Sequence, residues 1–141
     1  MIQTSYGYKI GLILCESDST KCLLGVKEGS SYCLKVVKIL KDDERANKTI
    51  KKEINILKKL KNHDNIIKFQ ESFSISKLLV NKIVIITEMM PMNLRRYWQL
   101  KGCILSEEVC KKIIFQVLDA VNFCHNNGVI HQDIKMVKKK K

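Results

Sequence analysis

Residues 32–61 read YCLKVVKILKDDERANKTIKKEINILKKLK, and the periodicity of this stretch changes once, near Asp42. Before Asp42, the β-branched and aliphatic residues around Lys35 are typical of a strand. After it, apolar residues recur at helical spacing, at Ile50, Ile54 and Leu57. Acidic residues at the start and lysines at the end suit a helix dipole, and Asp42 or Asp43 can cap its first turn. The stretch therefore predicts a strand followed by an amphipathic helix.

The flanking sequence predicts four further strands. Two upstream runs, 8–14 and 22–26, are separated by CESDSTK, which is rich in turn-forming residues. Two downstream runs, 66–69 and 82–88, are rich in β-formers and are separated by a polar connection. Together with residues 32–39 these runs predict a five-stranded antiparallel sheet with one packed helix, an α+β fold.

The C-terminal third predicts helices rather than strands. A short helix is expected over residues 93–100, after the single proline, Pro91, which marks a linker. Ser106 then begins a longer helix through Cys124, with two glutamates in its first turn. Its apolar stripe comprises Val109, Ile113, Ile114, Val117, Val121 and Cys124. No later segment supplies a partner for this stripe, so we expect a partial helical lobe.

Composition narrows the class of protein. At 141 residues, with 45% apolar and 28% charged residues, the chain is long enough for one domain of modest size and is globular in character. It has no apolar run long enough to span a membrane and begins without the features of a signal peptide. An intracellular protein of the cytoplasm or nucleus is the expectation, with no membrane partner.

Charge and cysteine content give little support to two other hypotheses, a nucleic-acid or membrane-surface protein and a disulfide or zinc protein. The net charge of +12 suits a nucleic-acid or membrane-surface protein, but the excess is almost entirely lysine, aromatic residues are only 6%, and no binding motif accompanies it. Solvated lysine-rich faces explain it, and no nucleic-acid partner is expected. The six cysteines show no C-x-x-C pair or histidine cluster, which favours core thiols over a disulfide framework or a zinc site.

The stretch VIHQDIK, residues 129–135, follows the long predicted helix and its Asn-Asn-Gly end. It resembles the catalytic-loop pattern I-H-R-D-[LI]-K of eukaryotic-type serine/threonine protein kinases. The resemblance implies that Asp133 orients the substrate hydroxyl and accepts its proton, while Lys135 steadies the γ-phosphate. A lysine two positions after the aspartate indicates the serine/threonine branch rather than the tyrosine branch.

Residues 32–35, YCLK, are similar to the V-A-I-K motif of the same family. The resemblance implies that Lys35 binds the α- and β-phosphates of ATP and pairs with Glu53 on the following helix. Ile83 to Met90 resembles the last strand of the ATP-binding lobe running into the interlobe hinge, with Thr87 as the gatekeeper. The remaining nucleotide-pocket residues implied by the resemblance are Leu14, Cys22, Cys33, Glu88 as the first hinge residue, and Met90 as the backbone partner of adenine.

Three positions depart from the family pattern. Residues 15–20, CESDST, stand where the family has its glycine-rich phosphate loop, and side chains there hinder a close backbone approach to phosphate. Gln132 replaces the arginine that pairs with a phosphorylated activation loop. Lys138 stands where the magnesium-binding asparagine is expected, and the 141 residues contain no Asp-Phe-Gly. Mg²⁺ is expected for the family, but its ligands are absent, so we assign no metal ligand.

The family resemblance implies three parts: an ATP-binding lobe over residues 1–90, a hinge end and partial C-terminal lobe over 91–135, and a lysine tail over 136–141. A truncated protein kinase, catalytically incomplete by itself, is the leading hypothesis. Its expected partners are ATP and a protein substrate, or the rest of a C-terminal lobe. The alternative is a pseudokinase-like fragment that docks on a partner protein through the exposed stripe of its long helix.

Overall fold

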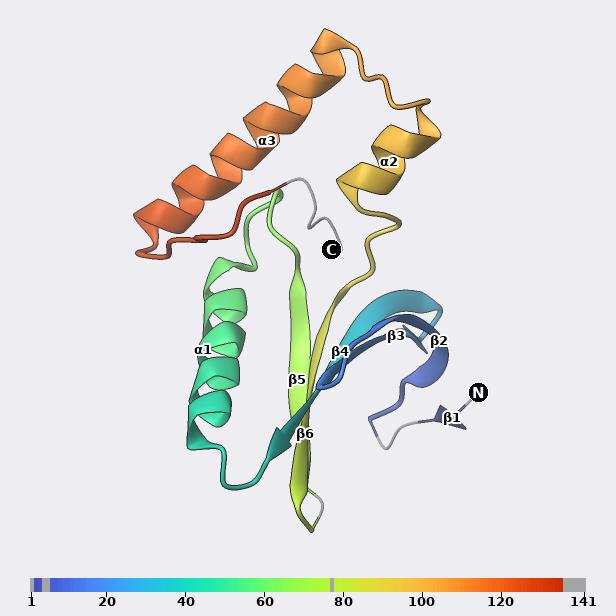
Figure 1. Ribbon diagram of the computed structural model, residues 1–141, viewed down its shortest axis with the longest axis vertical. Helices are drawn as coiled ribbons and strands as arrows, with labels where there is room; N and C mark the ends of the chain where they lie inside the picture. The colour runs from blue at the N-terminus through green and yellow to red at the C-terminus, as the bar shows by residue number, and fades with distance from the viewer. Residues whose placement is uncertain (1, 4–5, 77, 136–141) are drawn as a thin grey trace. The chain divides into compact units, whose positions relative to one another are not determined.

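One antiparallel sheet dominates the computed structural model, which describes residues 2–3, 6–76 and 78–135 (Figure 1). Its strand order is β1-β2-β3-β4-β6-β5. The strands are β1 (Ile2–Gln3), β2 (Lys9–Glu16), β3 (Thr20–Lys27), β4 (Ser30–Leu40), β5 (Phe69–Ser76) and β6 (Val80–Glu88), and the helices are α1 (Glu44–Leu60), α2 (Leu94–Leu100) and α3 (Glu107–Asn126). The predicted five-stranded antiparallel sheet is confirmed, and the two-residue β1 is an addition at its edge.

The chain divides into two compact units, and each is described by itself. The sheet unit comprises Met1–Lys61 and Ile67–Met89, and the helical unit comprises Asn62–Ile66 and Met90–Lys141. The predicted lysine tail, residues 136–141, lies outside the described residues. Within the described part of the chain, no helix is both long and apolar enough to cross a membrane.

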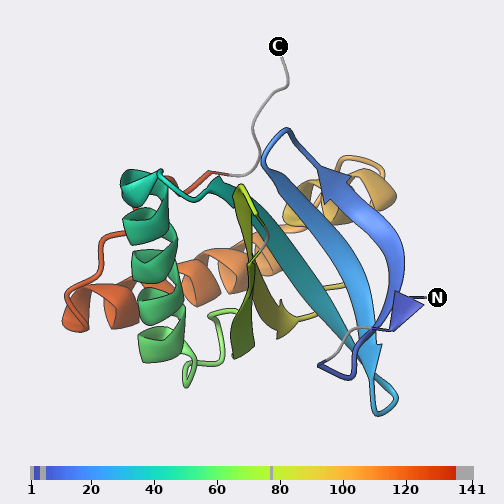
Figure 2. The same cartoon turned by 90° about the horizontal axis from the view of Figure 1, so that it is seen from below.

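Strand β4 lies at the centre of the sheet unit, paired along its length with β3 on one side and β6 on the other. One core cluster joins β4, β5 and β6 to α1, which runs along one face of the sheet (Figure 2): Ile39, Ile50, Phe69, Ile83 and Ile85. A second cluster contains Tyr8, Leu34, Val84 and Ile86. Because both faces of β6 are covered, its side chains are buried continuously from Ile83 to Thr87 rather than in alternation.

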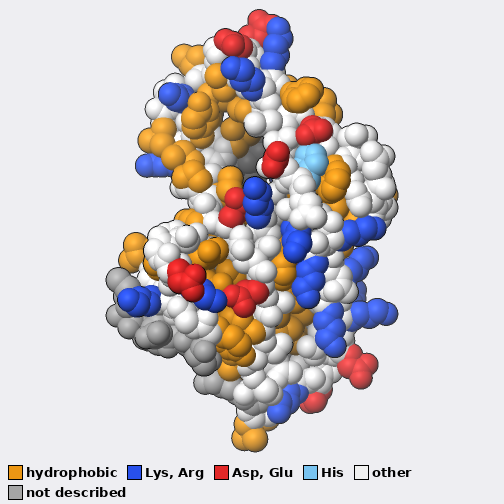
Figure 3. Space-filling model, turned by 180° about the vertical axis from the view of Figure 1, so that it is seen from behind, with side chains coloured by type: hydrophobic (Ala, Val, Ile, Leu, Met, Phe, Trp, Pro, Cys, Tyr) orange, Lys and Arg blue, Asp and Glu red, His pale blue; other side chains and the backbone are white. Residues whose placement is uncertain are grey.

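Helix α1 has the polarity that the sequence predicts. The Asp43 carboxylate accepts a hydrogen bond from the Ala46 amide at 2.8 Å, so Asp43 rather than Asp42 is the N-cap. Ile50 and Leu60 are buried. The lysines of α1 contribute to the band of positive side chains along its edge of the sheet unit (Figure 3). These lysines are exposed to solvent.

The strand predicted over residues 66–69 is placed wrongly, because β5 begins at Phe69 and extends through Ser76. The Ile66 amide donates to the His63 carbonyl at 3.1 Å, so the residues after α1 form a turn. The polar segment FQESFSIS is the strand itself, since it pairs with β6 at the sheet edge, where polar side chains meet solvent. Pairing with β6, which the local sequence does not show, is what makes residues 69–76 a strand.

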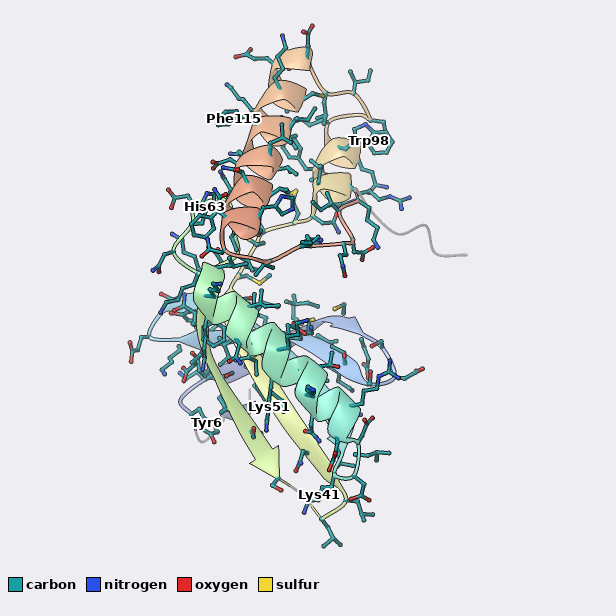
Figure 4. All side chains as sticks on the ribbon, turned by 90° about the vertical axis from the view of Figure 1, so that its left-hand side faces the viewer. Tyr6, Lys41, Lys51, His63, Trp98 and Phe115 are labelled. Atoms are coloured by element: carbon teal, nitrogen blue, oxygen red, sulfur yellow. The ribbon has the colours of Figure 1, made fainter. Side chains whose placement is uncertain are left out.

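The two helices of the helical unit are confirmed, with Asn93 and Ser106 as their N-caps. The predicted stripe of α3 is only partly correct. Val109, Ile113, Val121 and Cys124 are half-buried, whereas Ile114 and Val117 are exposed. Their exposed neighbours on α3 are Phe115 and Leu118. An apolar face of α3 is therefore uncovered in the described part of the chain, as Phe115 shows in Figure 4.

Candidate functional site

Lys35 and Glu53 meet on the face of the sheet that α1 covers. The Lys35 ammonium donates to Glu53 Oε1 at 2.6 Å. Strand pairing places Lys35 opposite Cys22 on β3 and Ile85 on β6. Ile50, one turn before Glu53, is buried against the sheet and fixes how α1 presents the carboxylate. The family resemblance implies this pair, and the structure brings the two side chains into contact.

The Lys35–Glu53 ion pair positions the Lys35 ammonium but contributes little to the free energy of unfolding. The two side chains retain 36% and 38% of their exposure, so water screens their attraction. Pairs of this kind contribute about 1 kcal/mol or less. The pair therefore serves to hold one ammonium in a fixed position, which is the requirement for binding an anion at a defined point.

A cavity of about 560 Å³ lies beside this pair, between β4, the turn before β3 and the first half of α1. Besides Lys35, its lining includes two more cations, Lys38 and Arg45, against the carboxylates of Asp43 and Glu53. Hydroxyl groups of Ser19, Thr20 and Thr49 also line it. Cations and hydroxyls are suitable donors to phosphate oxygens. Lys35 and Glu53 line this cavity, whereas the other expected nucleotide-pocket residues, Leu14, Cys22, Cys33, Glu88 and Met90, do not.

The turn between β2 and β3 occupies the place of the glycine-rich loop. The Ser17 amide donates to the Thr20 carbonyl at 2.8 Å, and the Ser17 hydroxyl donates to the same oxygen at 3.2 Å. Glu16 is paired with Lys21 at 2.5 Å. Since the Ser17 amide is already used within the turn, it is not available to phosphate.

The proposed pocket residues of β2, β3 and β4 share one region of the sheet. Cys22 opposes both Cys15 and Lys35, and Cys33 lies two residues before Lys35 on β4. Leu14 is the extra residue of a β-bulge, because Ile13 pairs with Leu23 and Cys15 pairs with the next residue, Cys22. The sequence gives no sign of this bulge, and Leu14 remains exposed.

Thr87 and Glu88 end β6. Thr87 is nearly buried and opposes Cys33 on β4. The Glu88 amide donates to the Lys68 carbonyl at 3.0 Å, and the Glu88 carboxylate accepts from the Lys68 amide at 2.7 Å. The backbone amide and the side-chain carboxylate of Glu88 therefore both hydrogen-bond to Lys68, the residue before β5. Met90 is exposed and belongs to the helical unit.

The helical unit holds Asp133 and Lys135. The Lys135 ammonium forms an ion pair with Asp133, and the Asp133 amide donates to His131 Nδ1 at 3.2 Å. Gln132 adopts a φ of 63°, in the left-handed region, and this reverses the chain so that the Asp133 amide meets the His131 ring. A non-glycine residue in this conformation is uncommon and is found preferentially at functional sites.

A polar cluster that the sequence did not predict fixes residues 62–66 to α3. His63 Nε2 lies 3.2 Å from Asp119 Oδ2, and the Asn65 side chain donates to the same oxygen at 2.8 Å. The ring of His63, which is labelled in Figure 4, packs on Phe123 with centroids 4.5 Å apart. Asp119 is the one charged residue between Lys112 and His125, and its partners Asn65 and His63 lie 54 and 56 residues away in the sequence.

A model of the protein kinase domain matches residues 10–137, most of the chain, and the chain therefore belongs to the protein kinase domain family. The match covers both the sheet unit with its Lys35–Glu53 contact and the Asp133–Lys135 loop. Across the residues that the structure describes, no group of three or more histidine, cysteine or acidic side chains is placed to hold a metal ion.

Proposed function

We propose that this chain binds ATP through its sheet unit and takes part in phosphoryl transfer to serine or threonine hydroxyls of proteins. The observation that carries the proposal is the 2.6 Å contact between Lys35 and Glu53 at the edge of a cation-lined cavity. Phosphoryl transfer depends on positioned charge rather than on covalent chemistry by the protein. An ammonium held by one carboxylate supplies such charge to the phosphate oxygens.

The acceptor side of the proposal rests on the second unit. Asp133 would accept a hydrogen bond from the substrate hydroxyl and take its proton as the phosphoryl group is transferred. Lys135, already paired with Asp133, would bind a phosphate oxygen close to that carboxylate. The lysine two positions after the aspartate is also the basis for proposing serine or threonine as the acceptor.

None of the described residues is proposed as a Mg²⁺ ligand. These residues present no cluster of three potential ligands. In the sequence, position 138, where the family has a ligand, is a lysine outside the described residues. We therefore propose that the 141-residue chain binds ATP with little help from Mg²⁺ and does not transfer phosphate by itself.

Thermal unfolding of the purified chain tests nucleotide binding. At ATP concentrations about ten times Kd, binding stabilises the folded state by about 1.4 kcal/mol, which raises the unfolding midpoint of the sheet unit by roughly 8 °C. The same rise is expected with Mg²⁺ and with EDTA. Lys35→Met should abolish it. Lys52→Met, which removes an exposed lysine of α1, should retain it. A cooperatively folded wild-type chain that shows no rise with ATP contradicts the proposal.

A docking module is the second candidate function, favoured by the uncovered apolar face of α3. Phe115 retains 71% of its exposure, and Ile114 and Leu118 are exposed beside it. The occupant with matching chemistry is a helical C-terminal lobe of a protein kinase, supplied as a separate chain. Co-elution of such a lobe with the chain, lost in Phe115→Asp and kept in Lys111→Ser, would support it. If the lobe does not co-elute with the chain either with or without nucleotide, this function is excluded.

A further inference from the structure

Three cysteines lie together on the face of the sheet that carries Lys35. Cys15 on β2 is directly opposite Cys22 on β3, and Cys22 is directly opposite Lys35 on β4. Directly opposed residues share a face, and so do residues two apart on one strand, which adds Cys33 to the group. All three are free thiols. The sequence suggested scattered core thiols, but none of the three is fully buried.

The thiols are close enough to interact. Interactions with Cys15 and with Cys33 contribute to the raised pKa of the Cys22 thiol, so the three side chains lie near one another. Directly opposed residues of antiparallel strands have Cα atoms about 4.5–5.5 Å apart, within the range of about 4.4–6.8 Å that a disulfide accepts. Cys33 is diagonal to Cys22, and diagonal neighbours are typically about 7–8 Å apart. The favoured pair is therefore Cys15 with Cys22.

The two sulfurs of this pair differ in their surroundings. Burial, followed by hydrogen bonding to Cys15, raises the pKa of the Cys22 thiol to about 12. Burial also raises the pKa of Cys33. Both of these thiols remain protonated near neutral pH and react slowly with oxidants. Cys15 is exposed at the bulged end of β2, so an oxidant in solution meets it first.

We propose that Cys15 and Cys22 are a redox modification site, at which a hydroperoxide converts the two thiols into a reversible disulfide across β2 and β3. The Cys15 sulfur attacks the peroxide, so that an S–O bond forms, the O–O bond breaks and an alcohol or water leaves. The Cys22 sulfur then attacks the Cys15 sulfenic acid, so that the S–S bond forms, the S–O bond breaks and water leaves with the Cys22 proton. Two thiols lose two electrons in total, and the hydroperoxide gains them.

The geometry of the site favours this second step. Burial, the largest cause of the raised pKa of Cys22, remains after Cys15 is oxidised, so proximity rather than thiolate character promotes the step. The pairing of β2 with β3 holds the sulfenic acid next to Cys22 rather than next to another molecule. A thiophilic metal is not proposed, because the described cysteines do not form a group placed for metal binding.

Peptide mapping of the oxidised full chain tests the site without any substitution. The chain is treated with one equivalent of hydrogen peroxide, alkylated and digested with trypsin without reduction. Trypsin cleaves after Lys21, between the two cysteines, so the disulfide links peptide 10–21 to peptide 22–27 and leaves Cys33 in peptide 28–35. We expect this linked pair, reversed by dithiothreitol, as the major product. A major link between peptides 22–27 and 28–35, or oxidised Cys15 without any link, overturns the proposal.

Matched variants separate this pair from general thiol oxidation. Cys22→Ser should convert Cys15 oxidation into a sulfenic acid that reacts with dimedone, and Cys33→Ser should leave the disulfide yield unchanged. Cys103, an exposed cysteine of the helical unit, is the internal reference. Its oxidation should give no intramolecular link. Equal yields of the linked pair in folded and in urea-unfolded chains would show that the fold does not build the site and would contradict the proposal.

Discussion

Gly25→Ala tests the packing between β3 and β4, which sets Cys22 opposite Lys35. A Cβ atom at Gly25 would lie 2.3 Å from Leu34 Cδ1, 3.2 Å from Cδ2 and 3.4 Å from Cγ. Leu34 is 1% exposed and lies in the core cluster with Val84 and Ile86, so it has little room to move. Overpacking of this kind costs about 1–3 kcal/mol. The loss of unfolded-state entropy offsets about 0.4–1 kcal/mol.

The expected net destabilisation is therefore about 1–2 kcal/mol, measured by urea unfolding followed by circular dichroism. Gly11→Ala is the matched control on β2, since its Cβ would meet Leu24 at an ordinary 3.4 Å and the site is exposed. We expect a change of less than about 0.5 kcal/mol there.

A double-mutant cycle makes the test specific to one contact. Leu34→Ala removes the carbon atoms that a new Cβ at residue 25 would strike. The cost of the double variant should fall short of the sum of the single costs by about 1 kcal/mol or more. Additive costs, or a Gly25→Ala variant as stable as Gly11→Ala, would refute the described register of β3 against β4.

Three further outcomes follow from the sheet unit. Asp43→Ala should lower the free energy of unfolding by about 1 kcal/mol, measured by urea unfolding, because the Ala46 amide loses its cap. Ile85→Ala should cost about 2–5 kcal/mol in the same measurement, since Ile85 is fully buried between β4 and β5. The pKa of Tyr8 is raised by burial and by its hydrogen bond to Glu71, so the folded state keeps the phenolic proton above pH 10, where the unfolded chain loses it. The stabilisation from this proton is complete below about pH 10 and declines above it, and Tyr8→Phe should make alkaline unfolding less steep.

Each of these three predictions has a control variant or a contradicting outcome within the sheet unit. Asp42→Ala should leave stability nearly unchanged, because only the Asp42 carbonyl contacts the helix, through the Glu44 amide. Leu79→Ala removes an exposed side chain and should cost less than about 0.5 kcal/mol. Identical alkaline slopes for the wild type and Tyr8→Phe would show that the phenol does not govern this pH range.

Local sequence predicts most of the secondary structure because the signals are local. Helix α1 is determined by its 3.6-residue apolar period and by Asp43, and α3 begins at Ser106 for the same kind of reason. The Lys35–Glu53 contact is expected from the family resemblance, which selects these two residues from the other lysine of the strand and from Glu44 on the helix.

The remaining features depend on partners distant in sequence. Strand β5 is polar enough to read as a loop, and only its pairing with the buried β6 makes it a strand. The bulge at Leu14 arises from the register between β2 and β3, which no local pattern specifies.

The sequence by itself determined the kind of element at most positions, the starts of the two long helices to within a residue, and the motifs in VIHQDIK and YCLK. Only the tertiary structure decided that Cys15, Cys22 and Cys33 share a face with Lys35, and that His63 and Asn65 bind Asp119. The physical reason is the separation in sequence between the residues that interact. Helix periods and caps are fixed by neighbours within a turn, whereas strand register and polar clusters are fixed by residues that only folding brings together.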